Sequence, residues 1–258
     1  MRDLITERAG RDNRAAHIFS WSLIACLLAV VFWFGFSQLG YRFAWDTIYN
    51  YRINFLRGYG MTLLISLFAL VLSLLLGILF GLGQSSNILP FRYLSRFYVE
   101  LVRGTPLLVQ ILIFFYVIAN AAGLNNRFVV GVLIMSLFSG AYIAEIIRGG
   151  VESIGESQRE TARSLGFSPY QTYRYVIFPQ VITRILPSLA GQLASLIKDS
   201  SLLSVIAIKE FTMAAREMNA NTFSTMEAYI PLAIGYLILT LPISRLTRYL
   251  ERRFSYDT

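Results

Sequence analysis

Six segments of the chain are predominantly apolar and about 20 residues long or longer, and this feature restricts the folds that the chain can adopt. They cover residues 18–36, 58–83, 94–122, 128–147, 185–208 and 228–246. A helix needs about 20 mainly apolar residues to cross a bilayer. The sequence therefore predicts an all-α integral membrane protein with about six transmembrane helices. The third of them is interrupted by the sequence RGTP at 103–106.

The composition agrees with a membrane protein that crosses the bilayer several times. The 258 residues are 55% hydrophobic and only 15% charged, and the mean hydropathy is +0.56, which is too apolar for an ordinary soluble domain. The single cysteine, Cys26, excludes an intrachain disulfide. The single histidine, His17, argues against a histidine-based metal site or a histidine general base in the membrane. We therefore expect neither catalytic residues nor a metal site.

The positions of the basic residues predict the orientation of the chain. A net charge of +8 would suggest nucleic acid in a soluble protein, but these arginines fall between the apolar segments, so no nucleic-acid partner is expected. Sixteen basic residues lie on the side of the two termini, and six lie on the other side. The positive-inside rule places both termini in the cytoplasm. The first segment lacks a small-residue cleavage site, so we expect it to be retained as a span.

The connection between the fourth and fifth segments is the longest on the cytoplasmic side, and it carries the signals of a folded loop. Gly166 suits a helix end that needs a left-handed residue, and Pro169 suits a first helical turn. Three serines precede Glu or Gln by three residues, as in a capping box: Ser153, Ser157 and Ser168, with Glu156, Glu160 and Gln171. These signals predict a short helix over 158–165 and a second from 169 to about 178, before Pro179. A helix of eight residues is marginal alone in water, so it must pack on this chain or on a cytoplasmic partner.

Four motifs, in order along the chain, resemble the polar amino acid permeases of ABC importers. The pattern ExxxxxG, followed about a dozen residues later by proline, resembles the coupling-loop motif of these permeases, whose usual form opens Glu-Ala-Ala. Glu160, Ala162 and Gly166 match this motif, and Thr161 replaces its second residue. The other similar motifs are RGTPLLVQ, AYIAEIIRGGVESI and KDSSLLSVI. The resemblance covers the chain from about residue 58 to the C-terminus.

The resemblance implies that the loop helix docks in a groove of a separate ATPase subunit. The residues that it assigns to this coupling are Glu160, Thr161, Ala162, Gly166, Ser168 and Pro169. It implies a five-helix type I importer core over 58–250, with the coupling loop at about 150–180. A cytoplasmic tail (1–17) and an extra transmembrane helix with an external loop (18–57) then precede this core, and a cytoplasmic tail (251–258) follows it.

The resemblance also implies the partners of the chain. They are a cytoplasmic ABC ATPase dimer, which binds ATP and Mg²⁺, and an extracytoplasmic substrate-binding protein. The implied location of the chain is the plasma (inner) membrane of a bacterium. A second permease chain, identical or homologous, is implied because an ATPase dimer offers two grooves. The chain itself has no GxxxxGK[ST] phosphate loop, so we expect it to be a transport subunit without a cofactor and not an enzyme.

Polar residues inside the apolar segments are candidates for a substrate path, because ionisable groups are costly at membrane depth and are functional candidates by default. Lys198 lies near or past the middle of its segment and either lines the path or forms a structural ion pair, whereas Asp199 points about 100° away from it. Gln110 and Gln192 either line the path or bridge helices. The full set of candidates is Arg103, Thr105, Leu107, Gln110, Gln192, Lys198 and Asp199.

The interruption of the third segment suggests how an amino acid is held. Thr105 is expected to cap a new helix that starts at Pro106, and the partial positive charge of a helix N-terminus in a broken span favours anionic substrate groups. Arg103 beside it is a candidate for binding the substrate carboxylate. Local ion pairs are also expected from the spacing of three residues, namely Glu145 with Arg148 and Glu100 with Arg103.

The charge pattern favours neutral polar or acidic substrates such as glutamine, glutamate or aspartate. A cationic amino acid at membrane depth needs a nearby carboxylate. In family members that transport basic amino acids, Asp or Glu can occur at the positions where this chain has Leu107 and Gln192. Import of arginine, lysine or histidine is the alternative. A stand-alone secondary transporter or channel would show repeated halves or a filter-like loop, and a membrane enzyme would show clustered histidine, cysteine or carboxylates. The sequence shows none of these.

Overall fold

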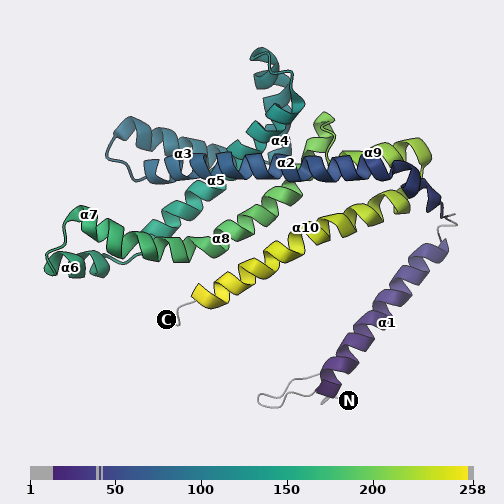
Figure 1. The fold of residues 1–258 in the computed structure, drawn as a ribbon, viewed down its shortest axis with the longest axis horizontal. Helices are drawn as coiled ribbons and strands as arrows, with labels where there is room; N and C mark the ends of the chain where they lie inside the picture. Colours follow the sequence, from purple (N-terminus) through teal and green to yellow (C-terminus); the bar gives the residue numbers. More distant parts are fainter. Residues whose placement is uncertain (1–13, 39–40, 42, 255–258) are drawn as a thin grey trace. The chain divides into compact units, whose positions relative to one another are not determined.

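The structure is entirely helical in the part of the chain that it describes. The computed structural model describes residues 14–38, 41 and 43–254, and every regular element in these ranges is a helix (Figure 1). The chain divides into two compact units, Met1–Ala44 and Trp45–Thr258. Four helices are long and apolar enough to cross a membrane, and the number rises to six if each of two bent helix pairs is one span. The predicted all-α membrane fold is therefore confirmed.

The first unit contains one apolar helix, α1 (Arg14–Gln38), which agrees with the predicted span over 18–36. None of the 18 residues of its apolar stretch, Ile18–Gly35, is buried within the protein. Trp21, Phe32 and Trp33 are all exposed. A helix that is apolar all round needs a nonpolar environment on every side, and a bilayer supplies it.

The second unit is built around α2 (Asp46–Gly83) and α5 (Arg127–Glu152), which pack along each other more extensively than any other pair of helices in the described chain (Figure 1). Glycines on α2 make the close approach possible. A Cβ atom added to Gly77 would lie 2.3 Å from Cγ2 of the fully buried Ile143, and one added to Gly81 would lie 2.9 Å from the carbonyl oxygen of Ala144.

Helix α2 begins at Asp46, so residues 46–57, which were expected to belong to an external loop, are helical. The reason is tertiary packing, which no local pattern shows. Phe55 is buried, and its ring meets the ring of Phe211 edge to face at a centroid distance of 5.8 Å. The twelve residues before Gly58 therefore extend the helix against another part of the same unit.

The third span is broken where the sequence predicts. Helix α3 (Leu89–Arg103) is followed by α4 (Leu107–Ile113) and a π-helical turn, η2 (Phe114–Ala119), and the two parts of the span meet at an angle of 109°. The break occupies residues 104–106, which confirms the predicted interruption at RGTP.

The loop that was expected on the cytoplasmic side contains α6 (Glu156–Ser164) and the short α7 (Pro169–Gln171). The expected end of the second loop helix before Pro179 is wrong, because η3 (Thr172–Ile177) continues directly into α8 (Phe178–Asp199). Pro179 lies two residues after the π-helical turn η3, and a local adjustment of this kind accommodates a residue that has no backbone N–H to donate. The helix that contains the predicted fifth span consequently starts before residue 185.

The C-terminal part of the fifth span bends and then leads into the last helix. After α8 come the 3₁₀ turn η4 (Ser200–Ile206) and α9 (Phe211–Thr222), bent by 45° from the preceding segment. Helix α10 (Thr225–Phe254) packs on α8 and α9 (Figure 1). It extends beyond the predicted 228–246 and includes 251–254 of the expected tail. Arg252 and Arg253 lie in its last turn, where cations stabilise a helix C-terminus.

A fully buried carboxylate, Glu210, joins α9 to α10, and sequence reasoning did not identify it. It is the N-cap of α9, and its side chain accepts hydrogen bonds from the N–H groups of Thr212 at 2.8 Å and Met213 at 2.6 Å. The Tyr236 hydroxyl of α10 donates to the same carboxylate at 3.2 Å. The neighbouring N–H of Phe211 donates to Thr62 of α2 at 3.1 Å.

Candidate functional site

The coupling loop is capped at one of the three predicted positions. The box at Ser168 is confirmed, because its hydroxyl accepts from the N–H of Gln171 at 3.3 Å and its own N–H donates to the Gln171 side chain at 2.8 Å. The boxes at Ser153 and Ser157 are wrong, since the N-cap of α6 is Gly155 without a side-chain cap. The Ser153 hydroxyl donates to the carbonyl of Gly150 instead. Ser157 lies inside α6, one position from its start.

Helix α6 ends at a left-handed glycine, as predicted. Gly166 has φ +78°, and its N–H donates to the carbonyl of Arg163 at 2.9 Å. The N–H of Phe167 donates to the carbonyl of Ala162 at 3.0 Å. These two bonds form the Schellman motif, which satisfies carbonyls that a helix end otherwise leaves unpaired. The chain therefore reverses sharply after α6 and enters the capped turn at Ser168.

The coupling candidates divide into one inward-facing residue and an exposed surface. Ala162 is buried, whereas the other candidates, Glu160, Thr161, Gly166, Ser168 and Pro169, are exposed. Two large side chains beside them, Leu165 and Tyr170, are 70% and 74% exposed. The loop therefore presents an acidic residue together with apolar groups on a surface that this chain leaves uncovered, and such exposed apolar groups mark interaction surfaces.

Arg184 closes the base of the loop, and sequence reasoning used it only as one of the topology-setting arginines. Its guanidinium Nη1 donates to the carbonyl of Ser153 at 2.5 Å and to the Ser153 hydroxyl at 3.0 Å. Ser153 follows the last residue of α5, and Arg184 lies in α8. The bond therefore joins α5 and α8, the two helices that the loop connects. No local sequence signal indicates it, because the partners are 31 residues apart.

The break in the third span is held by Gln110 and not by a threonine cap. The expected cap by Thr105 is wrong, because the N-cap position of α4 is Pro106 in an extended conformation, which leaves Thr105 outside the helix. The Gln110 side chain donates to the carbonyl of Val102 at 2.7 Å, and to the hydroxyl and carbonyl of Thr105 at 2.8 and 3.0 Å. Gln110 thus stabilises the bend itself, and Leu107 is buried at the start of α4.

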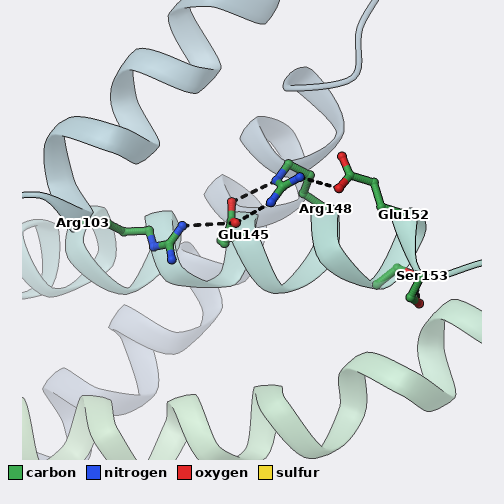
Figure 2. A network of polar contacts seen from close by, with 6 residues as sticks. Arg103, Glu145, Arg148, Glu152 and Ser153 are labelled. Atoms are coloured by element: carbon green, nitrogen blue, oxygen red, sulfur yellow. Dashed lines mark hydrogen bonds and ion pairs between the residues drawn. The ribbon is translucent and has the colours of Figure 1, made fainter.

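An ion network connects this break with α5 (Figure 2). The predicted pair on α5 is confirmed: Arg148 donates to both oxygens of Glu145, at 3.0 and 2.5 Å, and it also bonds Glu152. The expected pair of Arg103 with Glu100 is wrong, because Arg103 turns to α5. Its Nη1 lies 3.3 Å from Oε1 of Glu145. The spacing of three residues was correct for one pair and misleading for the other, because a tertiary neighbour competes for Arg103.

The remaining path candidates lie apart from the break. Gln192 donates to the hydroxyl of Ser139 at 3.2 Å and so bridges α8 to α5, which is the structural alternative expected for it. Lys198 is exposed and Asp199 is partly buried. Within the described ranges, neither of these two residues takes part in an ion pair. The structure thus brings together Arg103, Thr105 and Gln110 around one bend, and it does not join Lys198 or Asp199 to them by a hydrogen bond or an ion pair.

An open pocket of about 360 Å³ lies between α5 and α8, beside the loop that connects them. Its lining includes Glu145, Ser153 and Arg184, together with Gly149 and Gly150. The space therefore adjoins both the ion network and the closed base of the loop. The part of the chain that the structure describes contains no group of three or more His, Cys, Asp or Glu side chains that could hold a metal ion.

These observations define a class of protein: an all-helical membrane protein with a broken span in its core and a capped, exposed loop between α5 and α8. The comparison with protein families agrees with this class. Residues 73–256 match the family described as "Binding-protein-dependent transport system inner membrane component". The chain belongs to this family.

Relatives of known name support the assignment. The glutamine transport system permease protein GlnP of Escherichia coli K12 is 36% identical over 214 residues, which cover 82% of this chain and 98% of the relative. The arginine transport system permease protein ArtQ of Bacillus subtilis 168 is 31% identical over 199 residues, covering 77% and 91%. A crystal structure of an amino acid ABC transporter with histidines matches with a TM-score of 0.76 at 36% identity, covering 83% of this chain and all of that one.

The family fixes the general role of the chain. It is a multi-pass integral membrane protein of an inner-membrane transporter, and it is the permease of an amino acid ABC importer. A permease of this kind is a transport component without catalytic activity of its own. A binding-protein-dependent ABC permease implies an ATPase and a binding protein as its partners.

Proposed function

We propose that the chain is the membrane-spanning subunit of an ATP-driven importer for neutral polar or acidic amino acids, with glutamine the leading candidate. The substrate comes from an extracytoplasmic binding protein and crosses the membrane by alternating access. One carboxylate near the break, the exposed Glu100, makes no ion pair among the described residues. The substrate class therefore rests on three other positions. Leu107 and Gln192 are uncharged, and the carboxylate of Glu145 is already bonded by two arginines.

The physical argument is one of charge. An ammonium or guanidinium group at membrane depth needs a carboxylate partner, because an unpaired charge there is costly. Arg103 contributes a positive charge to the bend, but Glu145 neutralises much of it. The local environment therefore suits a side chain without net charge best, and it tolerates an acidic one better than a basic one. The name of the GlnP relative agrees with this preference.

Import of basic amino acids is the second candidate. Two observations favour it: a relative of 31% identity is named an arginine permease, and a structural neighbour of 36% identity was crystallised with histidines. A chain can share this fold and much of this sequence with transporters for cations, so the side chains around the bend must decide between the two candidates.

The coupling surface and the partners belong to the same proposal. Helix α6 docks in a groove of an ABC ATPase dimer, which binds ATP and Mg²⁺, and the contact surface includes Glu160, Thr161 and Gly166. A second permease chain, identical or homologous, occupies the second groove. Both termini lie in the cytoplasm, as the distribution of the basic residues predicts.

Competition for uptake tests the substrate class. The complex of permease, ATPase and binding protein is reconstituted in liposomes, and ATP-dependent uptake of labelled glutamine is measured against excess unlabelled amino acids. Glutamine, glutamate or aspartate should compete best. If labelled glutamine is not taken up, or if arginine or histidine lowers its uptake more than unlabelled glutamine does, the proposed substrate class is wrong. A matched variant, Gln192→Glu, adds a carboxylate and should increase competition by arginine.

A further inference from the structure

Glu145 occupies an unusual position, because it is shared between a permanent partner and an exchangeable one. Arg148, one turn along the same helix, holds both of its oxygens through two hydrogen bonds. This pair moves with α5 as one body, since residues three apart on a helix are neighbours in every position of that helix. Arg103 reaches the same carboxylate from the end of α3 through one contact at 3.3 Å. Figure 2 shows Arg103 approaching Glu145 from outside the row formed by Glu145, Arg148 and Glu152.

The contact between Arg103 and Glu145 joins two specific places in the fold. Arg103 is the last residue of α3, directly before the 109° break. Glu145 lies two turns before the end of α5, and the coupling loop follows that end. The guanidinium of Arg103 also lies over the ring of Tyr142, 5.8 Å from its centroid, and Tyr142 is again on α5. Both interactions of Arg103 therefore connect the break with the helix that leads into the loop.

The geometry suits a contact that forms and breaks. The side chains of Arg103 and Glu145 are 40% and 26% exposed, so separating them leaves neither charge buried without solvent. The two arginines and two glutamates of the network carry no net charge, and loss of the Arg103 contact leaves Glu145 still paired with Arg148. The pocket of about 360 Å³ that Glu145 lines leaves open space beside this end of α5.

We propose that Glu145 is a positioning residue of transport, which transmits displacement of the coupling loop from α5 to the break in the third span through Arg103. When the ATPase moves the loop, the end of α5 moves with it, and the pair between Glu145 and Arg103 determines whether the bend follows. The proposal rests on the proposed function in one respect only, namely that an ATPase acts on the loop. It does not depend on which amino acid is transported.

The test measures, at the break itself, whether displacement of the loop reaches the break. In a Cys26→Ser background, which removes the single native cysteine, Leu108→Cys places a thiol on α4, just after the break, at a position that is 39% exposed. The rate at which a thiol reagent modifies this residue is measured in the assembled complex with the ATPase, with and without ATP. We expect the rate to depend on nucleotide in this background. The dependence should be lost with Glu145→Gln and equally with Arg103→Gln.

A matched control and a double variant keep the test specific. Glu100→Gln removes a carboxylate three residues before Arg103 on the same helix, and it should keep the nucleotide dependence. Because Glu145 and Arg103 are expected to act as a pair, combining the two substitutions should add nothing to either one. Arg103→Lys, which keeps the charge, should restore part of the dependence.

Several results would overturn the proposal. They are a thiol rate that does not respond to ATP in the background protein, a full response in the Glu145→Gln variant, or additive effects of the two substitutions. Failure of the complex to take up glutamine would contradict the proposed substrate class, and it would leave the thiol measurement interpretable.

Discussion

At the scale of single residues, the loop depends on a backbone conformation that only one residue type adopts easily. Gly166 has φ +78°, and no atom lies within 4 Å of the position that its Cβ would occupy. A side chain there would meet no neighbour, so the constraint is on the backbone alone. Glycine populates this left-handed region at no cost, whereas other residues do not.

Gly166→Ala should therefore weaken the turn after α6 and reduce ATPase binding without preventing membrane insertion. The expected local cost is about 1 kcal/mol. The measurement is the amount of ATPase that co-purifies with the permease. Gly149→Ala is the control, because Gly149 also has free space around its Cβ position but lies inside a helix, where alanine is favourable. Equal co-purification by the two variants would show that the turn does not matter for docking.

At the scale of elements, the base of the loop is closed by Arg184. Its substitution by alanine should leave α6 able to bind the ATPase and should lower transport several-fold, because α5 and α8 no longer move together when the loop is displaced. Uptake per ATP hydrolysed by the reconstituted complex measures this effect. Arg174→Ala is the control, since Arg174 is an exposed arginine of the same loop that makes no bond to α5 among the described residues. Normal coupling in Arg184→Ala would argue against the role of this bond.

The contact between α2 and α5 depends on the small size of Gly77. Gly77→Ala should destabilise the core by about 1–3 kcal/mol, because its Cβ would overlap with the buried Ile143. Thermal unfolding of the purified permease in detergent measures the loss. Gly60→Ala, on the same helix with no atom within 4 Å, should leave the unfolding temperature unchanged or raise it, because alanine is the better helix former. A similar decrease for both variants would contradict the packing argument.

The elements differ in how far the sequence predicts them. The long apolar segments, the break at RGTP and the glycine after α6 are local signals, and the sequence predicts the presence of each of these features correctly. The start of α2 was missed because Phe55 packs against Phe211, far away in the chain. The partner of Arg103 was missed for the same reason, since Glu145 lies on another helix. At Thr105 and Ser153 a plausible local cap was expected, but competing hydrogen bonds to nearby carbonyls satisfy these hydroxyls.

At the scale of the whole molecule, the orientation in the membrane is the property on which the coupling argument depends. A single cysteine at Asn125, introduced in the Cys26→Ser background, should react with a membrane-impermeant reagent added outside intact cells, because the basic residues place this connection outside. A cysteine at Ser157 in α6 is the control and should react only after permeabilisation. The reverse pattern would place the loop outside and remove the basis for ATPase docking.

The length of α2 has a mechanical consequence for the core. Its 38 residues contain no proline and form one uninterrupted helix of about 57 Å, nearly twice the thickness of the hydrocarbon layer. It is fastened near its middle by Thr62 to α9 and near its C-terminal end by the close glycine contact with α5. Such a helix acts as a stiff strut of fixed length. We therefore expect bending during a transport cycle to be concentrated at the two bends of the described chain that lie outside α2, namely residues 104–106 and the bend before α9.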